Sequence, residues 1–310
     1  MPIYNINKPL GLSSHDVVSR TRKLLNTKKV GHAGTLDPLA TGVLVVLVDE
    51  ATKLSQFLIG SDKDYLAYVS FGASSPTLDA EGPIEKTSDA SNLKLAEIEP
   101  AAKKFLELKE QLPPNYSAIK KAGVKAYQAA RRGENLDLPK RAAEYYEIRL
   151  LGFAENRDLL PKSFAKIDGH WQAKTNGIEP ELPATLGDFP TALFYLKVKA
   201  GTYIRSFARD LGIELNQEAH LSGLVRTKAA SLELDDSIGL EQMPNTSGHS
   251  AIQTLPYPVI ELDKEKTKRI KLGQHLKVDF EGRVGLVHNN ELVAIAENIN
   301  GKMKLLRVWN

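Results

Sequence analysis

Three stretches of the chain repeat hydrophobic residues with the period of an amphipathic helix. Residues 15–25 place valine and leucine side chains on one face, and Ser13 or Ser14 directly before them provides an N-cap. Residues 202–215 show the same period, with apolar side chains on one face. The pattern also predicts a helix over residues 94–111, which is followed by a basic loop.

The other hydrophobic stretches are short and rich in β-branched and aromatic residues, which favours strands. Residues 43–48 are apolar throughout, as is typical of a strand buried on both faces. Four more strands are predicted, at residues 64–72, 145–153, 192–200 and 224–234. The protein is therefore expected to contain both helices and strands.

Three segments lack a steady period or consist of short elements. Residues 153–190 are rich in Gly, Pro and Asn, and they predict an insertion or long loop at the surface. Residues 241–250 have the composition of an inter-domain linker. Residues 257–310 alternate short strands with turn signals, which predicts a small C-terminal β-barrel.

Composition excludes several classes of site. The 310 residues include no cysteine, so disulfides and thiolate metal sites are excluded, and a cytoplasmic protein is favoured over a secreted one. The N-terminus lacks the basic start and apolar stretch of a signal peptide. The apolar run at 43–48 is far too short to span a bilayer, so we expect no membrane association.

The net charge of +3 is small, but the charge is unevenly distributed. Residues 257–310 hold ten Lys/Arg against seven Asp/Glu, and residues 103–149 hold eleven against six. Two basic regions on a nearly neutral chain suit a polyanion that is contacted at two places. An ordinary solvated face is the commoner explanation of any one such excess, since the sequence does not show clustering in space.

One loop, GHAGTLDPLATG at residues 31–42, carries a lone carboxylate, Asp37, among glycines and small residues. A phosphate-binding loop is disfavoured, because a central carboxylate repels phosphate and the Walker lysine is absent. The seven histidines show no metal-ligand spacing. Two interpretations remain open: a turn residue that caps its own backbone, and a nucleophile of the kind that attacks a sugar carbon in retaining glycosidases.

The chain contains nine motifs in order and at sensible spacing, namely INKPLGLSSHD, GHAGTLDPLATGVL, ATKLSQFL, DKDY, LDAEG, PPNYSAIK, AYQAARRG, KAGTYIRSFARDLG and LSGLVRT. Together they resemble the TruB family of tRNA pseudouridine synthases, which isomerise uridine at position 55 in the T-loop of tRNA. The resemblance covers roughly residues 3–230 apart from the insertion, and the C-terminal tail is similar to a PUA-type RNA-binding barrel. Any one motif is weak evidence, but their order is specific.

The resemblance implies three catalytic residues. Asp37 is the nucleophile, either attacking C1′ or promoting elimination to a glycal, and the sequence does not choose between these paths. Arg205 of the GTYIR motif pairs with Asp37, and a nearby cation keeps a carboxylate ionised. Tyr65 of the DKDY motif stacks on the flipped uracil and is placed for proton transfer. Without the motifs, a surface arginine and a core tyrosine are the simpler interpretations.

The resemblance also implies a substrate-binding set. His32 enters the RNA where the flipped base had been, and the glycines around it are expected to allow close approach to RNA. Tyr203 and Leu224 line the uracil pocket, with plain packing as the alternative for Leu224. Lys8, in a Lys-Pro motif, supports the active-site loops. The remaining positions are an acidic turn residue and a basic segment facing the tRNA arm, namely Asp79, Lys120, Lys121, Lys125, Arg131 and Arg132.

The expected fold is α+β. A pseudouridine-synthase catalytic domain with a mixed, mostly antiparallel sheet spans residues 1–248, with the insertion at about 153–190, and a PUA-like RNA-binding domain spans 256–310. The isomerisation involves no redox change and transfers no group from another molecule, so no cofactor or metal is expected. We expect tRNA as the partner, a monomer, no obligate protein partner and a cytoplasmic location. The alternatives are a guide-RNA-dependent synthase acting on ribosomal RNA, and a tRNA-folding chaperone or RNA-binding module.

Overall fold

The computed structural model describes residues 1–121, 123–134, 136–277 and 279–309. Its largest element is a sheet with the strand order β1-β3-β15-β4-β14-β11, in which β2 also pairs with β3 and β16 with β15. The β15–β3 pair is parallel and the other pairs are antiparallel, so the predicted mixed, mostly antiparallel sheet is confirmed. The strands are β1 (Ile3–Lys8), β2 (Val30–His32), β3 (Ala40–Val48), β4 (Lys63–Phe71), β11 (Tyr145–Ala154), β14 (Thr191–Val198), β15 (Ala219–Ala229) and β16 (Leu232–Glu233).

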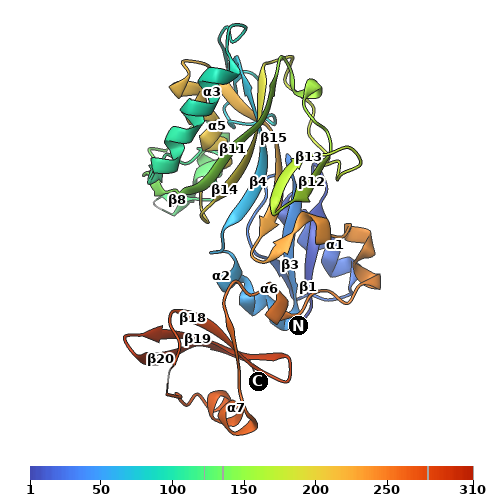
Figure 1. Ribbon diagram of the computed structural model, residues 1–310, viewed down its shortest axis with the longest axis vertical. Helices are drawn as coiled ribbons and strands as arrows, with labels where there is room; N and C mark the ends of the chain where they lie inside the picture. Colours follow the sequence, from blue (N-terminus) through green and yellow to red (C-terminus); the bar gives the residue numbers. More distant parts are fainter. Residues whose placement is uncertain (122, 135, 278, 310) are drawn as a thin grey trace.

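Helices cover one face of this sheet (Figure 1). Helix α1 (Ser14–Leu24) begins at Ser13, whose hydroxyl accepts a hydrogen bond from the Asp16 N–H, as the N-cap prediction requires. Helix α5 (Ile204–Glu214) packs against β15 and β4, and α3 (Leu95–Lys103) packs against β11. Aromatic residues of α5 and the strands, including Phe207 and Phe194 with ring centroids 5.4 Å apart, form the core between them.

The predicted helix over residues 94–111 is too long. After α3 the chain forms one 3₁₀ turn, η2 (Lys104–Glu107), and then the short strand β7 (Glu110–Gln111). Gln111 turns inward and its side chain hydrogen bonds to the backbone of Tyr203, which ends the helical path and begins the basic loop. The other short elements are η1 (Asp49–Leu54), α2 (Ser55–Leu58), β5 (Ala73–Ser74), β6 (Lys86–Thr87), β8 (Lys120–Lys121), β9 (Val124–Lys125), α4 (Ala126–Arg131), β10 (Arg141–Ala142), η3 (Arg157–Leu159), η4 (Leu234–Asp236) and α6 (Ala251–Thr254).

The insertion at 153–190 contains regular structure, contrary to the expectation of a surface loop. Strands β12 (Phe164–Ile167) and β13 (His170–Ala173) form a hairpin on the sheet face opposite α5 (Figure 1). Trp171 is only 2% exposed and packs with strand residues of that face. The insertion therefore supplies the cover that the second face of the sheet needs.

The C-terminal unit is a four-stranded sheet with the order β17-β18-β19-β20. Its strands are β17 (Val259–Glu261), β18 (Arg283–His288), β19 (Glu291–Ile299) and β20 (Lys302–Val308). Among the described residues β17 and β20 are the free edges, so the sheet is not closed into the predicted barrel. Helix α7 (Lys264–Lys271), capped by Asp263, lies beside it and was not predicted, because only Thr267 and Ile270 are buried in an otherwise charged segment.

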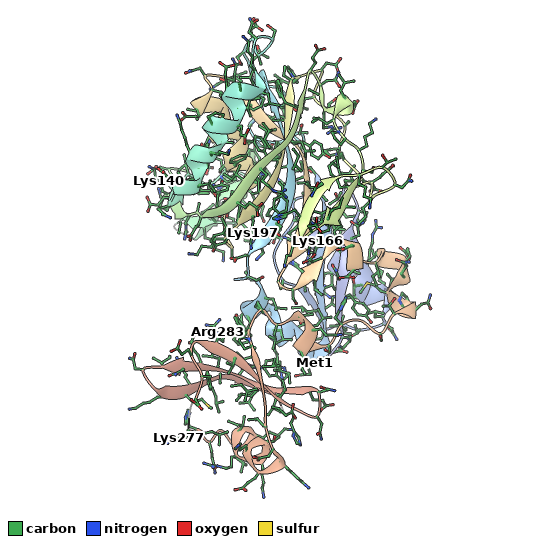
Figure 2. The ribbon with its side chains drawn as sticks, in the orientation of Figure 1. Met1, Lys140, Lys166, Lys197, Lys277 and Arg283 are labelled. Atoms are coloured by element: carbon green, nitrogen blue, oxygen red, sulfur yellow. The ribbon has the colours of Figure 1, made fainter. Side chains whose placement is uncertain are left out.

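The C-terminal unit contacts the rest of the chain through Tyr257 and through Trp309, whose indole N–H donates to the Glu50 carbonyl. Arg283, labelled in Figure 2 at the junction, donates a hydrogen bond to the Tyr257 hydroxyl, which in turn donates to the Phe57 carbonyl. The segment expected as a linker is itself packed, since the 3₁₀ turn η5 (Leu240–Asn245) buries Met243 against α1. An apolar residue every third position gives this turn a buried side.

Gly42 sits where β3 passes closest to β15. Its φ is +92°, and a Cβ placed there would lie 2.3 Å from the Arg226 carbonyl oxygen. We expect Gly42→Ala to lower the free energy of unfolding by about 2–5 kcal/mol, from backbone strain and overpacking together. Urea denaturation measures this loss.

Gly31→Ala is the matched control, because a Cβ on Gly31 would meet its nearest neighbour at 3.8 Å. We expect that variant to stay within about 0.5 kcal/mol of the wild type. Equal effects of the two substitutions would contradict a steric requirement at Gly42.

Candidate active site

The carboxylate of Asp37 forms an ion pair with Arg205, as the sequence predicts. Asp37 lies in the loop between β2 and β3, and Arg205 is in the first turn of α5. Arg205 Nε is 3.0 Å from Asp37 Oδ2, and the Asp37 side chain remains 36% exposed while that of Arg205 is 8% exposed. A largely buried cation therefore holds one carboxylate oxygen and leaves the acid accessible from outside.

Arg205 uses its remaining donors on two other segments. Its Nη1 lies 3.6 Å from Asp79 Oδ2 and donates to the Thr77 carbonyl at 3.0 Å, and its Nη2 donates to the Tyr116 carbonyl at 2.9 Å. Burial raises the pKa of Asp79, which is 1% exposed, while the Arg205 charge opposes that shift. The guanidinium thus joins the nucleophile candidate, the acidic turn and the start of the basic loop.

Lys8 supports the same loop from the other side. Its ammonium is buried and donates hydrogen bonds to the carbonyls of Pro9, Leu12 and Pro38, at 2.9, 2.6 and 3.3 Å. Burial lowers the Lys8 pKa to about 8, an effect that the nearby carboxylates of Glu81 and Asp37 oppose. The bond to Pro38 fixes the residue directly after Asp37, which agrees with the supporting role predicted for Lys8.

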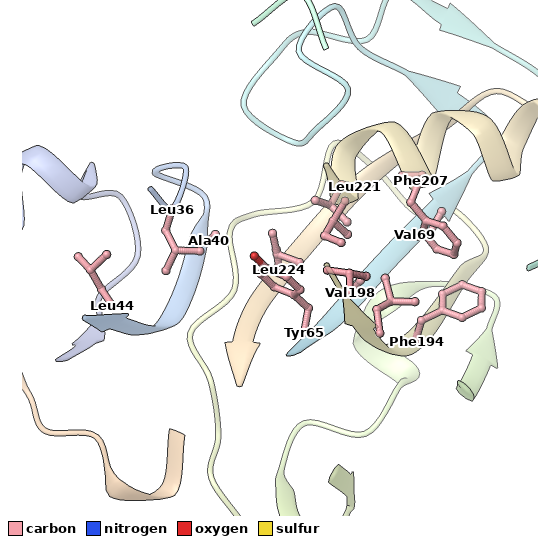
Figure 3. Close-up of a cluster of buried hydrophobic side chains, with 14 of the residues drawn as sticks. Leu36, Ala40, Leu44, Tyr65, Val69, Phe194, Val198, Phe207, Leu221 and Leu224 are labelled. Carbon is pink, nitrogen blue, oxygen red and sulfur yellow. The ribbon is translucent and has the colours of Figure 1, made fainter. Parts of the chain in front are cut away.

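Tyr65 and Leu224 lie side by side in the hydrophobic cluster between the sheet and its helices (Figure 3). Tyr65 in β4 is 8% exposed, and burial raises its pKa, so the phenol is protonated at neutral pH. Leu224 is 6% exposed and belongs to the same core cluster. Tyr203, at the N-cap of α5, is half-buried, and Asp37 and Arg205 both act electrostatically on its phenol. Tyr65 and Tyr203 therefore lie near the Asp37–Arg205 pair, and Leu224 packs beside Tyr65.

His32 ends β2, five residues before Asp37, and its side chain is half-buried. Partial burial and the positive charge of Arg226 lower its pKa, so the imidazole is neutral at neutral pH. Its Nδ1 is buried and has no hydrogen-bond partner among the described residues. The ring therefore lies half-buried at the edge of the site.

The five predicted basic residues lie on the loop that follows Tyr116. They occupy the β8–β9 hairpin and α4, where Lys125 and Arg131 place their charged groups 5.6 and 5.7 Å from the centroid of the Tyr127 ring. Lys121 pairs with Asp137 and Arg132 with Glu134. Lys120 is exposed. Arg205 reaches this segment through its bond to the Tyr116 carbonyl, and within the described residues no ion pair joins the five basic side chains to Asp37.

Sequence reasoning missed Arg226. The residue is 1% exposed, its guanidinium donates hydrogen bonds to the loop that carries Asp37, and its charge acts on the phenol of its strand partner Tyr65. The available signal was strand alternation, because Arg226 follows Leu224 by two positions and so lies on the same face of β15.

Comparison with known proteins decides the family. Residues 22–167 match the N-terminal domain model of the TruB family of pseudouridylate synthases. A protein named tRNA pseudouridine synthase B from Thermus thermophilus is 45% identical over 311 residues, covering 100% of this chain and 99% of that protein. The chain belongs to the TruB family. A second relative of the same name, from Deinococcus radiodurans, is 43% identical over 309 residues and covers 100% of both chains.

Solved structures support the same fold. A chain from the crystal structure of a Cbf5-Nop10-Gar1 complex aligns with a TM-score of 0.67 at 22% identity, over 99% of this chain and 84% of that one. A chain from the structure of an H/ACA RNP bound to a substrate RNA containing 2′-deoxyuridine aligns with a TM-score of 0.63 at 21% identity, over 100% and 85%. At these identities the likeness concerns the fold.

Two classes of feature are absent from the described residues. No group of three or more His, Cys, Asp or Glu side chains in that part of the chain is arranged to hold a metal ion. Within the same residues, no helix has the length and apolar character needed to cross a membrane.

Proposed function

We propose that this TruB-family protein isomerises uridine to pseudouridine in tRNA, at position 55 of the T-loop. The observation that carries the proposal is the Asp37–Arg205 ion pair beside Tyr65. Full-length relatives named tRNA pseudouridine synthase B, at 43 to 45% identity, support tRNA as the substrate class.

The geometry around Asp37 suits this reaction. Pseudouridine formation breaks the N1–C1′ bond, turns the uracil and joins its C5 to C1′. Both routes considered for Asp37, attack at C1′ and elimination to a glycal, need an ionised carboxylate, and the Arg205 guanidinium at 3.0 Å favours that state. Tyr65 is protonated at rest, so its first step is to stack on the base and donate a hydrogen bond rather than to accept a proton.

The RNA must bring its uridine out of a stacked loop to reach this site, at a cost of roughly a few kcal/mol. We assign to His32, at the end of β2 and half-buried, the role of filling the gap left by the base. Stacking on Tyr65 returns about 1–3 kcal/mol. The basic residues of the β8–β9 hairpin and α4 supply salt-dependent contacts with the tRNA backbone, which position the arm without selecting bases.

We assign catalysis to residues 1–248 and a PUA-like RNA-binding role to residues 256–310. The excess of basic residues in the C-terminal unit, with four Lys/Arg side chains on α7 beyond its first residue, supports RNA binding there. We further propose a cytoplasmic monomer that needs no protein partner. The guide-dependent alternative receives support only from distant likeness in fold, and the assembled catalytic set argues against a module that only binds or folds tRNA.

The test uses tRNA transcribed without modification and carrying [5-³H]uridine. Isomerisation exchanges the proton at C5, so purified protein alone should release tritium equivalent to one uridine per tRNA. A transcript with cytidine at position 55 is the substrate control and should release none. Tight binding with no release, or release that appears only after a guide RNA is added, would overturn the proposal. Release from the control transcript would overturn the assignment to position 55.

A further inference from the structure

Arg226 carries a buried charge that the chemistry described above does not use. Its Nη2 donates to the Gly34 carbonyl at 3.0 Å, its Nη1 to the Thr35 carbonyl at 3.3 Å, and its Nε to the Val43 carbonyl at 2.7 Å. No carboxylate of the residues that the structure describes lies within ion-pair distance of this guanidinium. Burying an unpaired cation costs free energy of folding. A role in stability alone therefore does not explain why an arginine stands at this position.

The sheet register places Arg226 directly beside Tyr65. The two residues are partners in the antiparallel β15–β4 pair, and the guanidinium charge acts on the phenol. Because a guanidinium only donates hydrogen bonds, the phenol O–H remains free to donate to another group.

Two glycines of the loop lie next to Arg226. Gly34 has a φ of +98°, which side chains rarely adopt, and a Cβ there would lie at ordinary contact distance, 3.6 Å from Arg226 Nη1 and 3.5 Å from the Lys63 side chain. Gly42 lets the backbone of Arg226 approach β3, because a Cβ there would lie 2.3 Å from the Arg226 carbonyl oxygen. The close approach to Arg226 therefore requires Gly42, whereas Gly34 serves the backbone conformation of the loop.

We propose that Arg226 is a positioning residue for the reaction, which sets the spacing between the Tyr65 phenol and the loop that carries Asp37. One planar guanidinium lies against both, because its two terminal nitrogens donate to the Gly34–Thr35 backbone and its charge acts on the phenol of its strand partner Tyr65. This inference rests on the proposed function and adds to it a residue that touches neither the base nor the sugar. Lysine has no such fork, so Arg226→Lys keeps the charge and loses the geometry.

Arg157 offers a matched control on the other face of the same sheet. It is 9% exposed, and its two terminal nitrogens donate to the carbonyls of Ser222 and Pro183, at 2.5 and 2.6 Å. It therefore resembles Arg226 in burial and in bonding to backbone, but it has no contact with the loop of Asp37. Arg157→Lys therefore measures how losing a buried, backbone-bonded guanidinium affects the fold alone.

The experiment compares single-turnover rates and tRNA affinities of Arg226→Lys and Arg157→Lys, each with and without Tyr65→Phe. We expect Arg226→Lys to slow the reaction by ~10²-fold with tRNA affinity within about threefold of the wild type, and Arg157→Lys to leave the rate within about threefold. In the Tyr65→Phe background the further loss from Arg226→Lys should shrink to less than about fivefold, because the two side chains act together. The proposal would be overturned if the rate losses of Arg226→Lys and Tyr65→Phe multiplied fully in the double variant. It would also be overturned if Arg226→Lys and Arg157→Lys lowered the rate equally.

A second readout does not depend on turnover. The protein is labelled with 3-fluorotyrosine, and the ¹⁹F resonance of Tyr65 is identified by its disappearance in Tyr65→Phe. Arg226→Lys should shift this resonance and change the pH at which it titrates, whereas Arg157→Lys should change neither. An unmoved resonance would overturn the Arg226–Tyr65 link even in an active enzyme. A shifted resonance in a protein that makes no pseudouridine would uphold the link while the proposed function fails.

Discussion

Asp37→Asn should abolish pseudouridine formation while tRNA still binds. Asparagine keeps the size of the side chain and an oxygen for Arg205, but it lacks the negative charge that both routes to C–N cleavage need. Loss of a nucleophile of this kind lowers the rate by at least ~10⁴-fold. Tritium release from [5-³H]uridine tRNA measures the rate, and filter binding measures affinity, which should stay within about threefold because phosphate contacts supply most of it.

The control is Asp89→Asn, at an exposed turn where the carboxylate accepts a hydrogen bond from the Ser91 N–H. It makes the same change of charge away from the site and should leave the rate within about twofold. If Asp37→Asn retained a tenth of the wild-type rate, the carboxylate would not be the nucleophile. Asp37 would then return to the turn-residue interpretation.

The central sheet was predictable because its strands are local signals. Nine buried residues in succession over β3 and the aromatic, β-branched run of β4 leave no alternative to buried strands. Helix α1 was predictable for the same reason, since the cap at Ser13 and the apolar face lie within twelve residues of each other. Periodicity alone did not order the strands or make β3 and β15 parallel, because pairing between distant segments depends on tertiary packing.

The insertion was mispredicted although one signal was present. Asp168 and Gly169, with φ of +49° and +80°, form the turn between β12 and β13, and Asp-Gly is a strong hairpin signal. The flanking strands are only four residues long and half polar, so their alternation was overlooked. The buried Trp171 acquires its partners from the sheet face, which no local pattern reveals.

The candidate site, like the fold, was predicted only in part. The pairing of Asp37 with Arg205 followed from the family resemblance, and the structure brings the two side chains together, whereas their roles stay predictions. Arg226 was missed because its acceptors are backbone carbonyls more than 180 residues earlier in the chain, and carbonyls carry no sequence signature. The resemblance implied side chains that act on the substrate, but not the buried groups that hold them in place.

Arg205→Met should lower the rate of pseudouridine formation by ~10²–10³-fold and also destabilise the protein. The substitution leaves the Asp37 carboxylate without its cation and the Asp79 carboxylate, 1% exposed, without its counter-charge. Breaking a buried pair in this way costs about 3–5 kcal/mol. Stability should be measured by urea denaturation between pH 5 and 8.

The pH dependence of stability distinguishes the effect of the unpaired Asp79 carboxylate from a simple loss of packing. Without Arg205, burial raises the pKa of Asp79 further above that of the unfolded chain, so the folded state binds a proton that the unfolded state releases as pH rises. The stability of Arg205→Met should therefore fall from pH 5 to pH 8 relative to the wild type. Adding Asp79→Asn should remove that slope and restore part of the stability, but not the rate, because Asp37 still lacks its partner. A double variant with restored activity would show that Arg205 serves Asp79 rather than the nucleophile.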